Sequence, residues 1–209
     1  MKSVIFDMDE VLVDSTPYHI DSWKIVLKRY GYDLPLEFRE KIYGRRGRDI
    51  IREIDPAIKE EKIDEIMGFA EEKFREIYRD RVRPVDNVVE FVKHLKNKGY
   101  TLALATSASA ENVRMILSAL GLLSFFNPIV CEKNVRRGKP EPDIYLKVLE
   151  LLEEKAENCM VLEDSFAGIT SAKRASIEVI GVVSTNKRAD LEKLLDIVIE
   201  SFDDLMKEF

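Results

Sequence analysis

Acidic and hydroxyl side chains directly follow, or end, three short apolar segments of this 209-residue chain. They are Asp7 and Asp9 after the first segment, Thr106 after the second, and Glu163 with Asp164 at the third. If each segment is a strand of a parallel sheet, these side chains gather at the rim where such sheets bind ligands. Any one of them has an ordinary explanation, because acids and hydroxyls also suit turns and helix starts. Their combination at strand ends indicates one shared site.

This set of residues suits phosphoryl transfer through a phosphorylated aspartate. Residues two apart in an extended segment point the same way, so Asp7 and Asp9 would face one pocket. Adjacent carboxylates separate their pKa values, which leaves one ionised nucleophile and one acid that can carry a proton. Asp7 and Asp164 could hold Mg²⁺, which prefers oxygen ligands. Thr106 would bind a phosphoryl oxygen, and Lys139 would neutralise charge on the phosphoryl group and on Asp7.

The elements that position these residues can be predicted from hydrophobic patterning. Short apolar runs rich in branched residues are typical of buried parallel strands. They span 4–6, 102–105, 129–131, 159–162, 179–183 and 197–199. Segments with helical period lie between them, as in the spacing of Val113, Ile116, Leu117 and Leu120. Strand-helix alternation predicts an α/β fold with a Rossmann-like parallel sheet.

Residues 15–82 interrupt this alternation. They hold helical patterns, such as Ile20, Trp23 and Leu27 on one face, and no convincing strand. A block of this length exceeds an ordinary crossover connection. We therefore predict an inserted α-helical subdomain over 15–82, hinged at its two ends, and an α/β core formed by 1–14 and 83–209.

Composition excludes several classes of protein. The 33 basic and 39 acidic residues leave a net charge of −6, which argues against binding to nucleic acid or to an anionic membrane. We expect no membrane span and no signal peptide. Cys131 and Cys159 fit a reducing compartment, so a cytoplasmic location is predicted. These cysteines and the two histidines, His19 and His94, lack the spacing of a zinc site. Absence of Gln with abundant Glu and Lys is typical of thermophile proteins.

Four motifs together resemble those of the haloacid dehalogenase (HAD) superfamily, in its branch with a helical cap. That branch holds β-phosphoglucomutases and sugar-phosphate phosphatases. The motifs span 7–15, 104–107, 138–145 and 162–169, and the resemblance covers the whole chain. It implies an HAD fold, a cap over the site and Mg²⁺-dependent chemistry on a small phosphorylated metabolite.

The resemblance also implies a role for each acid. Asp7 would be the nucleophile, and Asp9 would protonate the leaving oxygen, activate the attacking water and bind Mg²⁺ through its backbone carbonyl. Asp164 would be the metal carboxylate, with Glu163 as its close partner. One departure is Glu10, which stands where the family most often has Gly. We expect its side chain to point outward; the alternative is that it narrows the pocket.

The predicted cap offers candidates for holding the part of the substrate that does not react. Arg45 and Arg48, in the basic run 44–48, could grip an anionic or hydroxylated substrate. The alternatives are a solvated basic loop and a nucleic-acid patch, and net charge disfavours the second. The resemblance adds His19 at the cap entrance and Lys73 near a cap lysine of the mutase branch.

Two enzymatic functions remain open at this point. The loop 107–112 contributes Ser107 to the expected site, but it lacks the lysine that holds the second phosphate in a mutase and contains an acid. This difference favours a phosphatase over a β-phosphoglucomutase. The phosphatase would work through an aspartyl-phosphate intermediate. A signalling receiver domain is disfavoured because the phosphorylated Asp of receivers lies on the third strand, whereas the Asp pair of this chain follows the first.

A catalytically silent binding protein is the remaining alternative. We expect a monomer or small homo-oligomer.

Overall fold

One parallel β-sheet forms the centre of the computed structural model, which describes residues 2–33 and 44–209. Within these residues the six strands are β1 (Ser3–Phe6), β2 (Thr101–Ala105), β3 (Ile129–Val130), β4 (Cys159–Glu163), β5 (Glu178–Val182) and β6 (Ile197–Ile199). Their order in the sheet is β3-β2-β1-β4-β5-β6, and all neighbouring pairs are parallel. The predicted segments are therefore confirmed as strands of a doubly covered α/β sheet.

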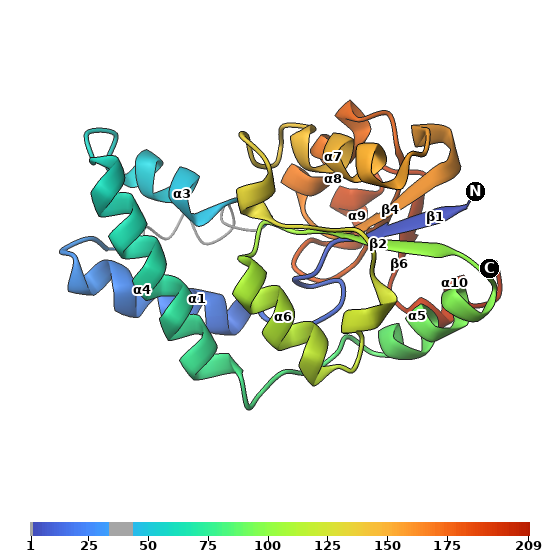
Figure 1. The fold of residues 1–209 in the computed structure, drawn as a ribbon, viewed down its shortest axis with the longest axis horizontal. Helices are drawn as coiled ribbons and strands as arrows, with labels where there is room; N and C mark the ends of the chain where they lie inside the picture. Colours follow the sequence, from blue (N-terminus) through green and yellow to red (C-terminus); the bar gives the residue numbers. More distant parts are fainter. Residues whose placement is uncertain (1, 34–43) are drawn as a thin grey trace.

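Helices cover both faces of the sheet (Figure 1). One face packs against α5 (Val88–Asn97), α6 (Ala110–Ala119) and α10 (Phe202–Leu205). The other packs against α7 (Asp143–Leu152), α8 (Phe166–Arg174) and α9 (Arg188–Leu191). Successive side chains of β1 alternate between these layers, since Val4 and Phe6 belong to one hydrophobic cluster and Ile5 to the other. Both faces of the sheet are therefore buried against helices, as the continuous apolar strands predict.

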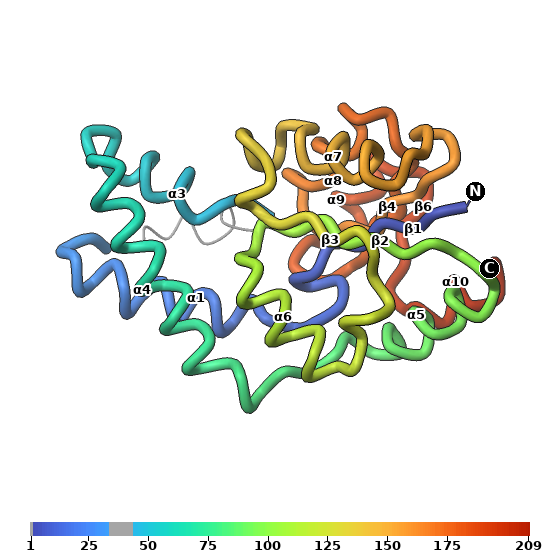
Figure 2. The backbone as a smooth tube through the Cα atoms, in the orientation of Figure 1, coloured from blue at the N-terminus to red at the C-terminus, as the bar shows by residue number. Residues whose placement is uncertain are grey.

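The insertion between β1 and β2 contains three helices among the described residues. They are α1 (Thr16–Arg29), α3 (Gly47–Ile54) and α4 (Glu60–Tyr78). These helices share a hydrophobic cluster that includes Trp23, Leu27 and Ile66 and is separate from the two clusters at the sheet. In Figure 2 they lie beyond the carboxyl ends of the strands, while both chain ends lie on the far side. The helical insertion thus faces the rim that carries the predicted site.

The two connections between insertion and sheet run side by side. Val13 pairs with Pro84 in an antiparallel bridge, and the Asp14 N–H donates to the Arg83 carbonyl at 3.3 Å. The Tyr78 hydroxyl donates to the Asp14 carbonyl at 3.1 Å, and burial raises the pKa of this hydroxyl. The expected boundaries fall at this paired crossing, and the division of the chain into two units stays a prediction.

Across residues 2–33 and 44–209, no helix combines the length and apolar character needed to cross a lipid bilayer.

Candidate active site

The ends of three adjacent strands place their polar residues at one level. Asp7, Thr106 and Asp164 each follow the last residue of β1, β2 and β4. Because Phe6 lies opposite Leu104 on one side and Leu162 on the other, the residues that follow these strands meet at the same rim. All three polar residues are at most 3% exposed. The rim predicted from the sequence is therefore formed.

A buried lysine joins two acids at the centre of this rim. Lys139 Nζ donates to Asp7 Oδ1 at 2.7 Å, to Glu163 Oε1 at 2.5 Å and to the Ala105 carbonyl at 3.2 Å. The Tyr145 hydroxyl donates to the same Glu163 oxygen at 3.0 Å. The Lys139 and Glu163 side chains are fully buried. Charges buried this deeply are tolerated only when they are paired and hydrogen-bonded, so each group holds the other in position.

The first turn of α8 surrounds the second oxygen of Glu163. This oxygen accepts hydrogen bonds from the Ser165 N–H at 3.0 Å and from the Ser165 hydroxyl at 3.1 Å. Ser165 in turn caps α8 by accepting from the Gly168 N–H at 3.0 Å. A β carbon at Gly168 would lie 1.6 Å from Glu163 Oε1, so only glycine fits at this position.

Asp164 is held by a polar segment that the sequence analysis did not single out. Asp164 Oδ2 accepts hydrogen bonds from the Ser184 and Thr185 hydroxyls, both at 2.9 Å, and its carbonyl accepts from Asn186 Nδ2 at 2.9 Å. These three residues follow β5, which neighbours β4 in the sheet. A polar run directly after a buried strand is the sequence signal that could have identified them, and it is the signal that identified Asp7 and Thr106.

The carboxylates at the rim suit a divalent cation. One oxygen each from Asp7, Glu163 and Asp164 lies within 4.8 Å of the others. Burial raises the pKa of Asp7 to about 8 although Lys139 opposes the shift, and burial with neighbouring negative charge raises the pKa of Asp164. A cation would offset this repulsion, and an all-oxygen donor set matches Mg²⁺. Both Glu163 oxygens are already engaged by protein donors, so Asp7 and Asp164 are the available ligands.

Asp9 is paired with a histidine of the insertion. Its Oδ1 accepts from the Ser15 hydroxyl at 2.5 Å and lies 3.3 Å from His19 Nε2. The His19 ring stacks on Phe74, with ring centroids 3.8 Å apart and an interplanar angle of 7°. Burial favours the neutral forms of both groups, but their mutual attraction prevails, lowering the pKa of Asp9 and raising that of His19. The pKa of Asp7 is raised because burial and the Glu163 charge outweigh Lys139, whereas His19 and Ser15 hold the pKa of Asp9 down.

Glu10 corrects one expectation from the sequence. Its backbone has φ 64°, in the left-handed region that favours glycine. The side chain does not point outward: its carboxylate lines the pocket and accepts from the Ser15 N–H at 3.0 Å and the Thr16 N–H at 2.7 Å. Unpaired N–H groups at the start of α1 attract this negative charge. These hydrogen bonds help to offset a backbone strain of about 1–2 kcal/mol for a residue with a β carbon.

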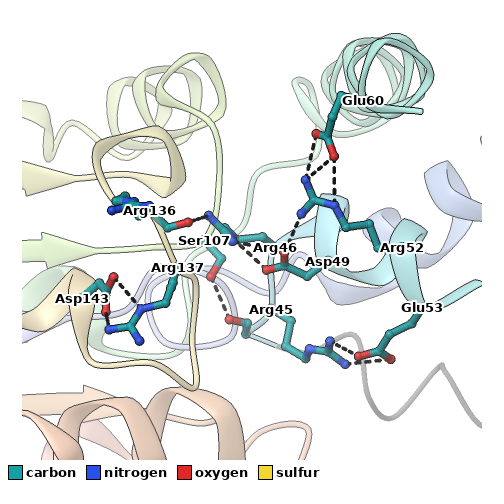
Figure 3. A network of polar contacts seen from close by, with 11 residues as sticks. Arg45, Arg46, Asp49, Arg52, Glu53, Glu60, Ser107, Arg136, Arg137 and Asp143 are labelled. Atoms are coloured by element: carbon teal, nitrogen blue, oxygen red, sulfur yellow. Dashed lines mark hydrogen bonds and ion pairs between the residues drawn. The ribbon is translucent and has the colours of Figure 1, made fainter. Parts of the chain in front are cut away.

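The arginines of the insertion divide into different roles (Figure 3). Arg45 lines the pocket and forms an ion pair with Glu53. Arg46 instead crosses to the sheet, where its guanidinium donates to the Arg136 carbonyl at 3.0 Å. Arg48 pairs with Asp64 at 2.5 Å and does not line the pocket.

Lys73, the second predicted contact on the insertion, also lies outside the pocket lining. It forms an ion pair with Glu76 on the same helix. Residues two apart on a helix are rotated by about 200°, so Lys73 and Glu71 occupy nearly opposite faces. Glu71 and Met67 are the α4 residues that line the pocket. The structure therefore brings His19, Arg45 and Ser107 to the pocket but not Arg48 or Lys73.

The pocket opens between the rim and the insertion. Asp7, Asp9 and Asp164 line it from the rim, and the apolar side chains of Trp23, Ile50 and Met67 line it from the insertion. Ser107 contributes from the loop after β2, and its hydroxyl donates to the Gly44 carbonyl of the insertion at 2.8 Å. This arrangement can hold a small anionic group at the rim and a partly apolar group beneath the insertion.

We predict that Gly168→Ala destabilises the protein by about 3 kcal/mol or more, because the added methyl group displaces the buried Glu163 carboxylate. Urea denaturation followed by circular dichroism measures the free energy of unfolding. The control is Gly68→Ala on α4, where a β carbon meets no atom within 4 Å and helix propensity favours alanine by up to about 1 kcal/mol. Equal stability of the two variants would contradict the steric argument.

Comparisons with known proteins agree with this geometry. Residues 4–182 match the family model described as haloacid dehalogenase-like hydrolase. A phosphatase of phosphorylated carbohydrates from Thermotoga maritima is 32% identical over 185 residues, covering 88% of this chain and 86% of that protein. The β-phosphoglucomutase of Bacillus subtilis is 28% identical over 202 residues, covering 87% and 83%. A hydrolase from Pseudomonas syringae shares the fold, with a TM-score of 0.89 at 23% identity over 100% of this chain and 97% of that chain. The chain belongs to the haloacid dehalogenase-like hydrolase family.

Proposed function

We propose that this enzyme is a Mg²⁺-dependent phosphatase that hydrolyses small phosphorylated metabolites, sugar phosphates among them, through a phosphorylated Asp7. The observation that carries the proposal is the contact between Asp7 and the buried Lys139, beside Asp164 at the same rim. A carboxylate oriented by a fixed cation can attack phosphorus while the lysine neutralises charge that develops on the phosphoryl oxygens.

The reaction proceeds in two displacements at phosphorus. Asp7 attacks the phosphoryl group, the bond to the leaving oxygen breaks, and the Asp9–His19 pair supplies a proton to that oxygen. Water then attacks the aspartyl phosphate, Asp9 accepts the proton of the water, and inorganic phosphate leaves with Asp7 regenerated. Mg²⁺, held by Asp7, Asp164 and the Asp9 carbonyl, would supply positive charge to the phosphoryl oxygens. Thr106 and Lys139 stabilise the same oxygens.

The helical insertion acts as a cap in this proposal. Ser107 and Gly44 join it to the sheet, and Arg46 crosses to the Arg136 carbonyl. Trp23, on α1 of the insertion, offers an apolar surface to the leaving group. Such a cover excludes water from the reacting centre while the aspartyl phosphate forms.

Other features of the proposal rest on the sequence. The excess of acidic residues disfavours nucleic acid as a partner, and the cysteine content favours a cytoplasmic location. A thermophilic source and a monomeric or small homo-oligomeric state remain predictions of the same kind.

A β-phosphoglucomutase is the second candidate, favoured by the similarity to the Bacillus subtilis mutase. Incubation with β-glucose 1-phosphate and Mg²⁺ separates the two activities. We expect inorganic phosphate as the product, because loop 107–112 carries no lysine. Accumulation of glucose 6-phosphate would establish the mutase instead. A screen of phosphorylated metabolites for phosphate release then identifies the preferred ester.

We predict that Asp7→Asn lowers the Mg²⁺-dependent hydrolysis of p-nitrophenyl phosphate by about 1,000-fold or more, since the amide cannot act as the nucleophile. The rate of p-nitrophenol release is the measurement. Asp86→Asn, at an exposed loop position, is the control and should keep the wild-type rate. Full activity of Asp7→Asn would eliminate the proposed mechanism.

We predict that Thr185→Val raises the Mg²⁺ concentration for half-maximal activity by about tenfold, because Asp164 loses one of the hydroxyls that orient it. Titration of the hydrolysis rate with Mg²⁺ measures this effect. The half-buried Thr170, whose hydroxyl donates to the Phe166 carbonyl within α8, provides the control Thr170→Val. If both variants require the same Mg²⁺ concentration, Thr185 does not position the cation ligand.

A further inference from the structure

Glu71 places a negative charge in the wall of the pocket, opposite the rim. This α4 residue lines the same pocket as Asp7 and Asp164. Its Oε2 accepts hydrogen bonds from the Ser109 hydroxyl and from Asn112 Nδ2, both at 2.6 Å. Ser109 and Asn112, at the start of α6, are at most 4% exposed. The carboxylate is therefore held at a defined position between the insertion and the sheet.

Among the described residues no basic side chain forms an ion pair with Glu71, whereas acids such as Asp64 and Glu60 pair with Arg48 and Arg52. Arg75, one turn beyond Glu71 on α4, donates instead to Asn112 Oδ1 at 3.0 Å. The charge of Glu71 therefore acts on the pocket, and it contributes to raising the pKa of His19.

The basic side chains that line the pocket or its rim are already paired with other acids. Arg45 pairs with Glu53, and His19 lies against Asp9. Lys139 bridges Asp7 and Glu163 at the rim. One phosphoryl group can be balanced at the rim by Lys139 and Mg²⁺. A second anion on the same substrate, reaching toward α4, would meet the Glu71 carboxylate, because the nearby Arg75 is hydrogen-bonded to Asn112 and does not line the pocket.

We propose that Glu71 is a specificity-determining residue that restricts this pocket to phosphate monoesters with an uncharged, hydroxyl-bearing leaving group and excludes substrates with a second phosphate. The inference rests on the proposed function of the pocket as a phosphatase site. A hydroxyl can donate to the carboxylate, while Trp23, Ile50 and Met67 cover the apolar face of a sugar or polyol. A mutase that moves a phosphoryl group between two positions of one sugar must bind a doubly phosphorylated intermediate. A pocket that excludes bisphosphates therefore disfavours the mutase reaction.

The test compares glucose 6-phosphate with glucose 1,6-bisphosphate, which differ by one phosphate. Each compound is measured as an inhibitor of p-nitrophenyl phosphate hydrolysis by the wild type and by Glu71→Gln. The glutamine side chain keeps an acceptor for Ser109 and Asn112 but removes the charge. We expect the inhibition constant of the bisphosphate to fall about tenfold, while that of the monophosphate changes less than threefold. Glu72→Gln, at the adjacent exposed position, should change neither constant.

A second variant separates charge from a structural role of the hydrogen bonds. Ser109→Ala removes one donor to Glu71 and leaves the carboxylate, so the preference for the monophosphate should persist. In the wild type, the preference should also weaken between 0.05 and 0.5 M salt, as screening shortens the range of the repulsion. An unchanged bisphosphate constant in Glu71→Gln, or equal shifts for both compounds, would overturn the proposal.

Failure of the proposed function gives a different result. Wild-type protein that does not hydrolyse p-nitrophenyl phosphate with Mg²⁺ would contradict the phosphatase assignment. Calorimetric titration of the wild type and Glu71→Gln with glucose 1,6-bisphosphate would still measure the effect of Glu71 on binding. The same tenfold tightening is expected there, and its absence would reject the role of Glu71.

Discussion

The buried contact of Lys139 with Asp7 and Glu163 is the constraint on which the rest of the site depends. Burying one cation with two carboxylates is favourable only when every charge has partners, so the surrounding elements must supply them. Tyr145 and the first turn of α8 saturate Glu163, and glycine at 168 makes room for that turn. Because Glu163 is saturated by protein donors, the negative charge that remains lies on Asp7 and Asp164. A divalent cation would offset that charge, and in the proposed function the same contact orients Asp7 as the nucleophile.

The insertion completes the site through polar contacts at its edge and a core of its own. Its helices bury a separate hydrophobic cluster, while Ser107, Ser109 and Asn112 of the sheet side hydrogen-bond to its backbone and to Glu71. The boundary is also partly apolar, because Phe74 and Tyr78 of α4 are buried in the hydrophobic cluster of the sheet. The pocket lies between the rim of the sheet and the helices of the insertion, and in the proposed function the rim carries the reacting groups while the insertion selects the substrate.

Much of the fold and of the rim was predictable, because the signals are local. Short branched segments predicted the strands, and the acids at their ends predicted the residues that meet around Lys139. The segment after β5 carried the same signal and was overlooked, although Thr185 holds Asp164. Glu10 was expected to point outward, and the interaction that this expectation left out is the attraction of its carboxylate to the unpaired N–H groups at the start of α1.

The sequence by itself determined the α/β class, the polar rim at the strand ends and the presence of a helical insertion. Hydrophobic period and strand-end polarity depend on neighbours within a few residues, and parallel strands bring their ends together without further information. Only the tertiary structure decided which insertion residues face the pocket. Ser109 and Glu71 are 38 positions apart, and the rotation of α4 that brings Glu71 inward and turns Lys73 away is set by packing against α1 and α6. Such rotations follow from contacts between distant segments, which local patterning does not encode.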